Sequence, residues 1–336
     1  MPSTSAFVVD EKAVREEIGR DRLVHLFERM LLIRRFEERA GAMYQQKKIA
    51  GFLHLYIGQE AVATGMLSHL TPGKDFVTTS YRCHAHALLL GLDPKELMAE
   101  MYGKDTGNVH GRGGSMHFFS KEKGLLGGHG IVGGQIPVGT GAAFTAKYLQ
   151  TGGVSVTFFG DGASPQGSFH ESLNMAALWD LPAIYCIENN LYGMGTASTR
   201  AVAVQDIAES KAPGYDVPAY TVDGFDPYAC WKVGQETVAR SRKGQPLLIE
   251  FKTYRYRGHS VSDAGLYRSK EEVARYQSQD PIERVKQDLI EAKWSTAGDL
   301  DAIDERIQER IREACAFADE SSEPPLSELS AHVYAG

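Results

Sequence analysis

The amino-acid sequence predicts an α/β protein whose parallel sheet is flanked by helices. Three apolar runs, at residues 154–160, 182–189 and 246–256, are typical of buried strands, and helical segments alternate with them. Strands that are apolar along their whole length belong to parallel sheets covered on both faces. Because the chain contains no internal repeat and no long low-complexity linker, we expect one packed domain with helical ends.

The first 50 residues are expected to form a helical N-terminal extension. Between residues 11 and 49, large apolar side chains recur at helical spacing among arginines and glutamates, which predicts amphipathic helices. These side chains are Leu23, Leu26, Phe27, Met30, Leu31 and Ile33.

Residues 51–275 are expected to form the α/β domain, which begins with glycine-rich and histidine-rich sequence. Short helices are predicted there, such as Pro94 to Tyr102. The stretch from Gly107 to Gly134 is densest in glycine. Such a stretch is either a loop that is ordered around another group or a flexible loop.

A strand-helix-strand unit follows. The first two apolar runs are its strands, and one face of the helix between them is marked by Phe169, Leu173, Ala176 and Ala177. A second helix, around Ala229 to Ser241, precedes the third apolar run.

The C-terminal region, residues 276–336, is predicted to be helical as far as Ala318. Asp280 precedes a proline at the first helical position, and Glu283 is placed to complete a capping box.

Composition excludes several classes of partner. The net charge is −7 and the basic residues are scattered among acids, so there is no basic face for nucleic acid or anionic lipid. No apolar run reaches the length of a membrane span. The four cysteines lie far apart without C-x-x-C spacing, which favours a reducing compartment. We therefore expect a cytoplasmic (bacterial) protein, or a mature chain of an organellar matrix.

One acid and one amide are placed to share a cation. Asp161 directly follows the first apolar run, Asn190 directly follows the second, and 26 residues (163–188) separate the Gly-Asp-Gly triplet from the Asn-Asn pair. In a right-handed strand-helix-strand unit, both carboxyl ends emerge at the same edge of the sheet. Oxygen ligands suit Mg²⁺, which phosphates and water usually complete. The pattern therefore predicts Mg²⁺ together with a phosphorylated ligand.

The glycines beside Asp161 support this interpretation. Gly160 and Gly162 let a ligand approach the backbone closely. The free amides of Gly162 and Ala163, at the start of the following helix, are expected to hold an anion.

The spacing of these two motifs resembles the signature of thiamine-diphosphate enzymes. Further stretches resemble the alpha subunits of the pyruvate dehydrogenase first enzyme, within the thiamine-diphosphate-dependent 2-oxo acid dehydrogenase family. They are GFLHLYIGQEA, SYRCHAHALLLG, GRGGSMHFFS, GGHGIVGGQIPVGTG and YRYRGHSVSDAGLYR. The resemblance covers nearly the whole chain and implies a thiamine-diphosphate-binding fold for residues 51–275.

The resemblance implies thiamine diphosphate and Mg²⁺ as cofactors, and it assigns roles residue by residue. Asp161, Asn190 and the backbone carbonyl of Tyr192 would bind the metal. The expected diphosphate contacts are Tyr81, Arg82 and His259, and the expected aminopyrimidine contacts are Gly130 and Val132. His54 would lie near the substrate, and His54 and His259 are the expected catalytic residues. Arg82 suits its role because a guanidinium presents a fork of donors to phosphate oxygens.

The resemblance also implies partners. A beta subunit would complete an alpha2beta2 heterotetramer with the cofactor at the interfaces, since single-chain relatives carry further domains that 336 residues cannot contain. The acetyl group of pyruvate would pass to the lipoyl domain of dihydrolipoyl acetyltransferase. GRGGSMHFFS and IENN favour pyruvate over the alternative, a branched-chain 2-oxo acid or acetoin dehydrogenase. Ser260 matches a regulatory phosphorylation site of the animal enzymes.

Three other interpretations remain open on the sequence. Gly128, Gly130 and Gly133 spell a dinucleotide fingerprint, but no strand signal precedes it and no acid lies between Gln135 and Gly160 to receive a ribose hydroxyl. His84 and His86 are placed to bind zinc if a third ligand joins them. A binding subunit without chemistry is the third alternative.

Overall fold

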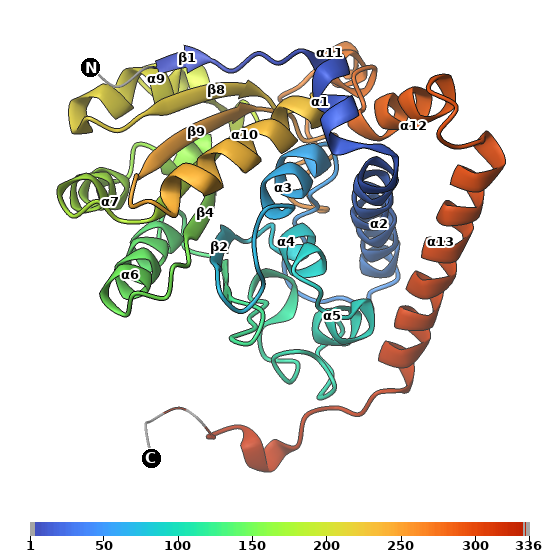
Figure 1. Ribbon diagram of the computed structural model, residues 1–336. Coiled ribbons are helices and arrows are strands. Elements are labelled where there is room, and N and C mark those ends of the chain that lie inside the picture. Colours follow the sequence, from blue (N-terminus) through green and yellow to red (C-terminus); the bar gives the residue numbers. More distant parts are fainter. Residues whose placement is uncertain (1–3, 332, 334–336) are drawn as a thin grey trace.

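A computed structural model describes residues 4–331 and 333 (Figure 1). Among these residues, seven strands form one sheet in the order β1-β8-β9-β5-β4-β2-β3, and every neighbouring pair is parallel. The strands are β1 (Thr4–Ala6), β2 (Phe76–Ser80), β3 (Leu125–His129), β4 (Ser155–Gly160), β5 (Ala183–Asn189), β8 (Ala219–Asp223) and β9 (Leu247–Lys252). A short antiparallel pair, β6 (Tyr192–Gly193) with β7 (Thr196–Ala197), lies outside the sheet. The predicted α/β fold class is confirmed.

The central strands are buried on both faces because consecutive side chains enter different cores. Phe158 belongs to the larger apolar cluster, whereas Phe159 belongs to the smaller one. Cys186 and Tyr185 divide in the same way. A strand with two apolar faces cannot show the alternation of a half-exposed strand. This arrangement accounts for the uninterrupted apolar runs of the sequence.

Helices cover both faces of the sheet (Figure 1). The smaller cluster packs the sheet against α6 (Gln135–Tyr148), α7 (Gly167–Leu178) and α9 (Ile207–Lys211). The larger cluster packs it against α2 (Arg20–Gln45), α3 (Glu60–Leu67), α4 (His84–Leu89), α5 (Pro94–Met101) and α10 (Pro227–Ser241). The remaining helices are α1 (Glu11–Ile18), α8 (Ser198–Ala201), α11 (Lys270–Gln277), α12 (Pro281–Glu291) and α13 (Ala297–Glu320).

The helical ends of the chain pack against each other. Arg35 of α2 makes hydrogen bonds of 2.8 and 2.6 Å to both carboxylate oxygens of Asp304 in α13. Arg34 bridges the buried Glu60 of α3 and Asp280, which precedes α12. The N-terminal segment is not wholly helical, because β1 extends the edge of the sheet beside β8. The division into residues 1–50, 51–275 and 276–336 stays a prediction.

Caps explain where the C-terminal helices begin. The Asp280 side chain accepts a hydrogen bond from the Ile282 amide, which confirms Asp280 as a cap. A reciprocal capping box is found one helix later, between Thr296 and Asp299, at the start of α13.

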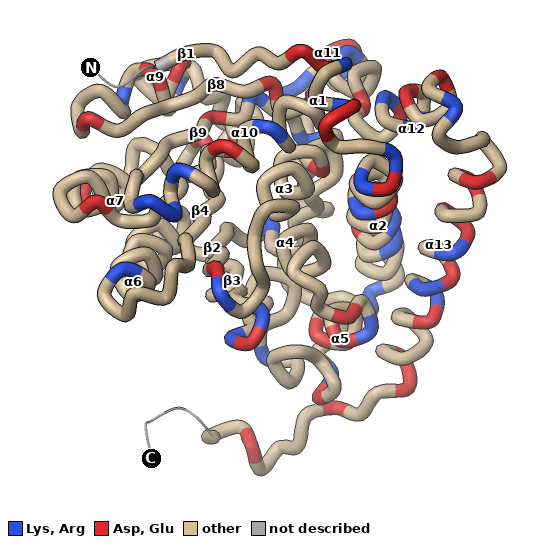
Figure 2. Tube along the Cα trace, in the orientation of Figure 1, with Lys and Arg blue, Asp and Glu red and all other residues tan. Residues whose placement is uncertain are grey.

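Acidic and basic residues are mixed along the chain, and α2 and α13 carry both signs (Figure 2). Within the described part of the chain, every helix is too short or too polar to cross a membrane. The four cysteines are free and buried.

Candidate active site

The predicted site residues follow the carboxyl ends of five adjacent strands. This edge is where open parallel sheets bind ligands. Tyr81 and Arg82 follow β2, Gly130 and Val132 follow β3, Asp161 follows β4, Asn190 follows β5, and His259 comes after β9. His54 reaches the same region from the connection between α2 and α3, as its ring contacts show. The fold therefore brings the whole predicted set to one edge.

Asp161 is a buried carboxylate with an open coordination position. It is 1% exposed, and its Oδ2 makes no hydrogen bond to any described residue. Burial raises the pKa of Asp161 to about 6, against the lowering effect of backbone N–H groups and of Arg255. A buried, unpartnered carboxylate oxygen is costly unless a ligand pairs with it. Asp161 therefore fits a cation site.

The two asparagines have different surroundings. Asn189 is satisfied on both sides, since its Nδ2 donates to Glu250 at 2.7 Å and its Oδ1 accepts from the Leu191 amide at 3.2 Å. Asn190 donates through Nδ2 to Gln59 at 3.0 Å, and its buried Oδ1 is left without a partner in the described chain. Gln59 thus orients the Asn190 amide so that its oxygen is free for a metal.

The third expected metal ligand lies beside the Asp161 turn. Gly162 and Gly193 approach so closely that a Cβ atom on Gly162 would stand 3.6 Å from the Gly193 Cα atom. The Tyr192 carbonyl, one residue before Gly193, accepts a hydrogen bond of 3.2 Å from Arg255. The side chain of Tyr192 points to Glu272 through its hydroxyl, so only the backbone of Tyr192 is available to the site.

One expectation about the anion site is wrong. Gly162 and Ala163 do not begin the following helix, because Asp161–Ala163 form a 3-10 turn and α7 starts only at Gly167. The reason is local: the Ser164 amide bonds to the Asp161 carbonyl, and the Gln166 amide bonds to the Ala163 carbonyl. Any anion held by Gly162 and Ala163 would meet amides of a turn rather than of a helix.

Three aromatic rings form a cluster next to the sheet edge. The His54 ring centroid lies 4.4 Å from that of Tyr81 and 4.9 Å from that of His259, and the Tyr81 and His259 centroids lie 5.3 Å apart. Burial, reinforced by Arg82, lowers the pKa of His54 to about 2 and that of His259 to about 3. Both imidazoles are therefore neutral near pH 7 in the free chain. His54 Nδ1 is buried and lacks a protein partner among described residues.

Arg82 is buried and already has partners. Its Nη1 donates to the Leu55 carbonyl at 2.7 Å, and its Nη2 donates to the His259 carbonyl at 2.6 Å. Burial and the nearby Arg255 lower the pKa of Arg82 to about 10. In this chain Arg82 joins the segments of His54 and His259, and a contact with the diphosphate stays a prediction.

Gly130 and Val132 lie on the surface. Val132 is 44% exposed and its neighbour Ile131 is 80% exposed. Exposed apolar side chains next to a ligand site are typical of a surface that another subunit covers. Ile131 and Val132 therefore fit a surface that another subunit covers at this end of the glycine-rich stretch.

Arg255 is a residue to which the sequence analysis gave no role. Its side chain is 1% exposed, and Nη2 donates to the carbonyls of Tyr192 and Met194 at 3.2 Å. Its Nε and Nη1 have no partner in the described chain. A buried guanidinium with two unpaired donors is costly unless an anion binds to it, so Arg255 fits next to an anion site. The signal available in the sequence was a basic residue within the third apolar run, at residues 246–256.

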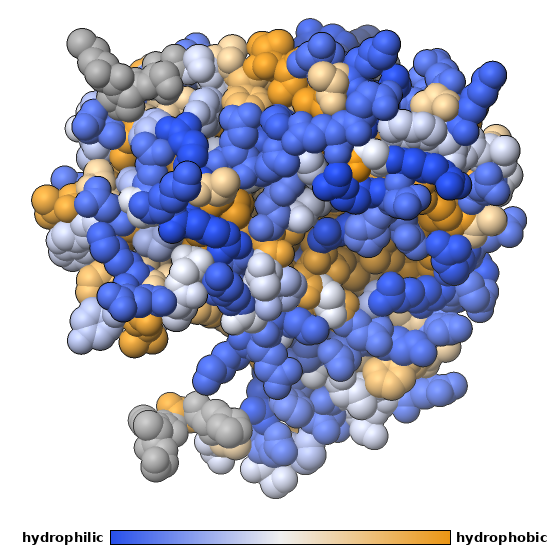
Figure 3. All heavy atoms as spheres, viewed as in Figure 1, coloured by the Kyte–Doolittle hydropathy of each residue, from blue (hydrophilic) through white to orange (hydrophobic). Residues whose placement is uncertain are grey.

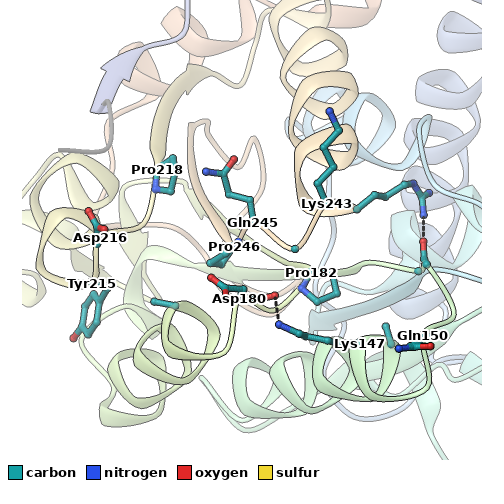
Figure 4. Close-up of a pocket in the computed structure, with 16 residues that line it drawn as sticks. Lys147, Gln150, Asp180, Pro182, Tyr215, Asp216, Pro218, Lys243, Gln245 and Pro246 are labelled. Atoms are coloured by element: carbon teal, nitrogen blue, oxygen red, sulfur yellow. Dashed lines mark hydrogen bonds between the residues drawn. The ribbon is translucent and has the colours of Figure 1, made fainter.

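Two hollows of similar volume lie at opposite edges of the sheet. One, of about 730 Å³, is lined by residues that precede the strands, including Gly153, Pro182, Pro218 and Pro246, with Lys147 and Lys243 at its rim (Figure 4). It is therefore at the amino edge, away from Asp161. The other, of about 780 Å³, is lined by Leu55, Gly258, Ser260 and Asp263 and adjoins the ring cluster. The second hollow therefore lies beside the candidate site, and its lining includes chain neighbours of His54 and His259 but neither of these residues.

The structure corrects one argument about the alternatives. The dinucleotide fingerprint begins inside a strand, β3, and α6 comes after it, so the prediction that no strand leads into it was wrong. That strand was not predicted because its sequence, LLGGH, contains two glycines, which are uncommon in strands. As for zinc, the described residues contain no group of three His, Cys, Asp or Glu side chains suited to a metal ion. His84 is instead bonded to Glu37 and Ser115, both at 2.8 Å.

Comparison with known proteins gives a consistent family. The model of the dehydrogenase E1 component family matches residues 28–327. The chain is 48% identical to the pyruvate dehydrogenase E1 component subunit alpha of Zymomonas mobilis, over 96% of this chain and 91% of that protein. It is 48% identical to the same subunit of Rhizobium meliloti, over 93% and 90%. A chloroplastic subunit alpha-3 of Arabidopsis thaliana is 44% identical, over 95% and 76%.

Proposed function

The chain belongs to the dehydrogenase E1 component family, among the alpha subunits of pyruvate dehydrogenase, and from this premise we propose how its residues hold the cofactor. The sequence-based recognition is confirmed, and pyruvate is favoured over the branched-chain and acetoin alternatives. The family uses thiamine diphosphate. The metal, the site residues and the details of assembly are our proposals.

Mg²⁺ would be held by Asp161 Oδ2, Asn190 Oδ1 and the Tyr192 carbonyl. The observation that supports this proposal is the pair of buried side-chain oxygens without protein partners, on residues that follow adjacent strands. Both are hard oxygen ligands, and three protein ligands leave room for phosphate oxygens and water.

Thiamine diphosphate, when bound, supplies the electron sink for loss of CO₂ from a 2-oxo acid. Tyr81 and His259 would position its diphosphate. Arg82 would hold the His259 segment in place through its hydrogen bond to the His259 carbonyl. Arg255, which donates a hydrogen bond to the Tyr192 carbonyl, would add positive charge to the diphosphate end of the site. His54, kept neutral by burial, would offer a hydrogen bond near pyruvate through its free Nδ1.

A beta subunit would cover the aminopyrimidine end and complete an alpha2beta2 heterotetramer. Exposed apolar residues support this proposal: Ile131 and Val132 at the site, and a larger set on α6, on α7 and at their C-terminal caps. This set, the α6–α7 surface, consists of Val138, Phe144, Tyr148, Leu149, Met175, Leu178 and Trp179. Apolar atoms are visible over these helices at the left of Figure 3. The lipoyl domain of dihydrolipoyl acetyltransferase would take the acetyl group, and the bacterial cytoplasm or an organellar matrix is the proposed location.

The test is to purify the chain together with its beta subunit and assay pyruvate-dependent reductive acylation of lipoamide. We expect activity that requires both thiamine diphosphate and Mg²⁺, and a higher kcat/KM for pyruvate than for branched-chain 2-oxo acids. A complex that prefers a branched-chain substrate, or that works without Mg²⁺, would overturn the proposal.

A further inference from the structure

Glu100, at the end of α5, is a buried carboxylate surrounded by backbone amides. It is 0% exposed. Its Oε2 accepts hydrogen bonds of 2.8 Å from the amides of Val109 and Gly111. Its Oε1 accepts from the amides of Gly113 and Gly114, at 2.7 and 3.1 Å. Four amides around one carboxylate form a nest of the kind that binds anions.

The four amides belong to residues 107–114, which we call the glycine loop, and close packing accounts for two of its glycines. A Cβ atom on Gly107 would stand 2.4 Å from Glu100 Oε2, so only glycine fits against the carboxylate. A Cβ atom on Gly113 would stand 2.3 Å from the His117 carbonyl oxygen. The loop is therefore folded around a side chain of its own chain rather than around a ligand.

The glycine loop is connected to the cofactor edge through His117. The ring Nδ1 of His117 is 2.9 Å from the Gly128 carbonyl, which it bonds as a donor. The same ring lies against Gly130, where a Cβ atom would be 3.4 Å from the imidazole. The next residue, Phe118, accepts a hydrogen bond from the Gly128 amide. The end of β3 and the position of Gly130 thus depend on the segment that leaves the loop.

A second anchor holds the same segment. Ser115 follows the loop directly, and His84 Nε2 lies 2.8 Å from its hydroxyl and 3.0 Å from its carbonyl. Glu37 in turn bonds His84 Nδ1 at 2.8 Å. Glu100 and His84 therefore fix the segment 113–117 from two sides.

We propose that Glu100 is a positioning residue, which folds the glycine loop and thereby sets Gly130 and Val132 for the aminopyrimidine end of the cofactor. The inference rests on the proposed function, since it concerns one end of that site. The diphosphate end is built separately, from the turn at Asp161 and from Asn190. A change at Glu100 should therefore affect one end of the site and not the other.

The test compares two ligands on the complex with the beta subunit. Glu100→Gln leaves one carbonyl oxygen for two of the amides and turns a donor group toward the other two. We expect the Kd for thiamine diphosphate, at saturating Mg²⁺, to rise by about tenfold, which corresponds to about 1.4 kcal/mol. The Kd for pyrophosphate with Mg²⁺, which occupies only the diphosphate end, should change by less than about twofold, well under that energy. Both constants are measured by calorimetric titration.

Glu96→Gln is the matched control, because Glu96 is an exposed acid on the same helix. Its two dissociation constants should equal those of the wild type. Equal weakening of both ligands by Glu100→Gln would overturn the inference in favour of a general structural role, and unchanged binding of both would also overturn it. A wild-type complex that binds neither ligand would instead contradict the proposed function.

A second variant covers the case in which Glu100→Gln does not fold. His117→Ala leaves the nest intact and removes the bond to Gly128. We expect the same pattern, with weaker thiamine diphosphate binding and unchanged pyrophosphate binding. Wild-type affinity for thiamine diphosphate in His117→Ala would overturn the proposed connection.

Discussion

Asn189 and Asn190 are adjacent residues whose amides serve different purposes. Asn190→Ala removes a free buried oxygen, so we expect the affinity for Mg²⁺ to fall by at least about tenfold. The variant also loses the single hydrogen bond to Gln59, so the free energy of unfolding should fall by about 1 kcal/mol. Asn189→Ala removes two hydrogen bonds, one buried and one partly buried, and we expect the free energy of unfolding to fall by about 1–3 kcal/mol. Titration with Mg²⁺ and chemical unfolding of the cofactor-free protein measure the two effects. A large loss of stability in Asn190→Ala, with Mg²⁺ affinity retained, would contradict this assignment.

The carboxylate of Asp161 supports a prediction about Mg²⁺-dependent cofactor binding. Asp161→Ala should abolish Mg²⁺-dependent binding of thiamine diphosphate with the fold intact, since no core side chain changes. Asp161→Asn keeps an oxygen ligand and should retain part of the binding. Calorimetric titration measures binding, and far-ultraviolet circular dichroism verifies the fold. The control is Asp301→Ala, which removes an exposed acid from α13. Tight binding by Asp161→Ala would refute the metal site.

At this scale the sequence predicted which residues meet but not what each one contacts. Asp161 and Asn190 could be paired because parallel strands end at one edge. Gln59, which orients Asn190, and Leu55, whose carbonyl holds Arg82, lie in the stretch GFLHLYIGQEA, where nothing in the sequence pairs them with these partners. Contacts between distant segments depend on the packing of the whole domain, which a single sequence does not display.

Among the elements, the loop between β9 and α11 supports a prediction about Ser260. Ser260 is buried, and its hydroxyl lies 2.9 Å from that of Ser262. The neighbouring His259 amide is held by Asp263 at 2.7 Å, and the Val261 amide by the Leu53 carbonyl at 2.9 Å. Ser260→Glu places a charge in this buried position. We expect lipoamide acylation to fall by at least about tenfold, or about 1.4 kcal/mol at the transition state, with a smaller effect for Ser260→Ala.

The assay for Ser260 uses the complex with the beta subunit at saturating thiamine diphosphate and Mg²⁺. Ser262→Glu is the matched control, because it adds the same charge at an exposed position of the same loop. Wild-type rates in Ser260→Glu would remove Ser260 from the active-site loop. Equal losses in both variants would point to the charge of the loop rather than to the buried position.

Strands were predictable where they were apolar throughout. The runs that became β4, β5 and β9 were found from composition alone. β2 was missed because FVTTS is half polar, β3 because two of its five residues are glycine, and β8 because AYTVD is short and ends on an acid. The residues of each of these strands have a weak preference for strand structure of their own. Pairing and packing with neighbouring strands in the sheet stabilise them.

For the whole molecule, the α6–α7 surface predicts dependence on a partner. Leu178 is 70% exposed, and Leu178→Glu should weaken assembly with the beta subunit while the isolated chain still folds. Analytical ultracentrifugation of the mixed subunits measures assembly. Val8→Glu, at another exposed apolar residue, is the control and should assemble normally. The isolated wild-type chain should not turn over pyruvate. Normal assembly of Leu178→Glu would place the partner on a different face.

The nest around Glu100 also bears on the entropy of cofactor binding. Fixing the backbone of one residue costs about 1–2 kcal/mol. A glycine-rich loop that ordered only around its ligand would subtract that cost, residue by residue, from the affinity. Here the carboxylate of Glu100 fixes the loop when the chain folds. The cofactor would therefore meet a surface that is already rigid, and its binding should show a small entropic penalty from this part of the chain.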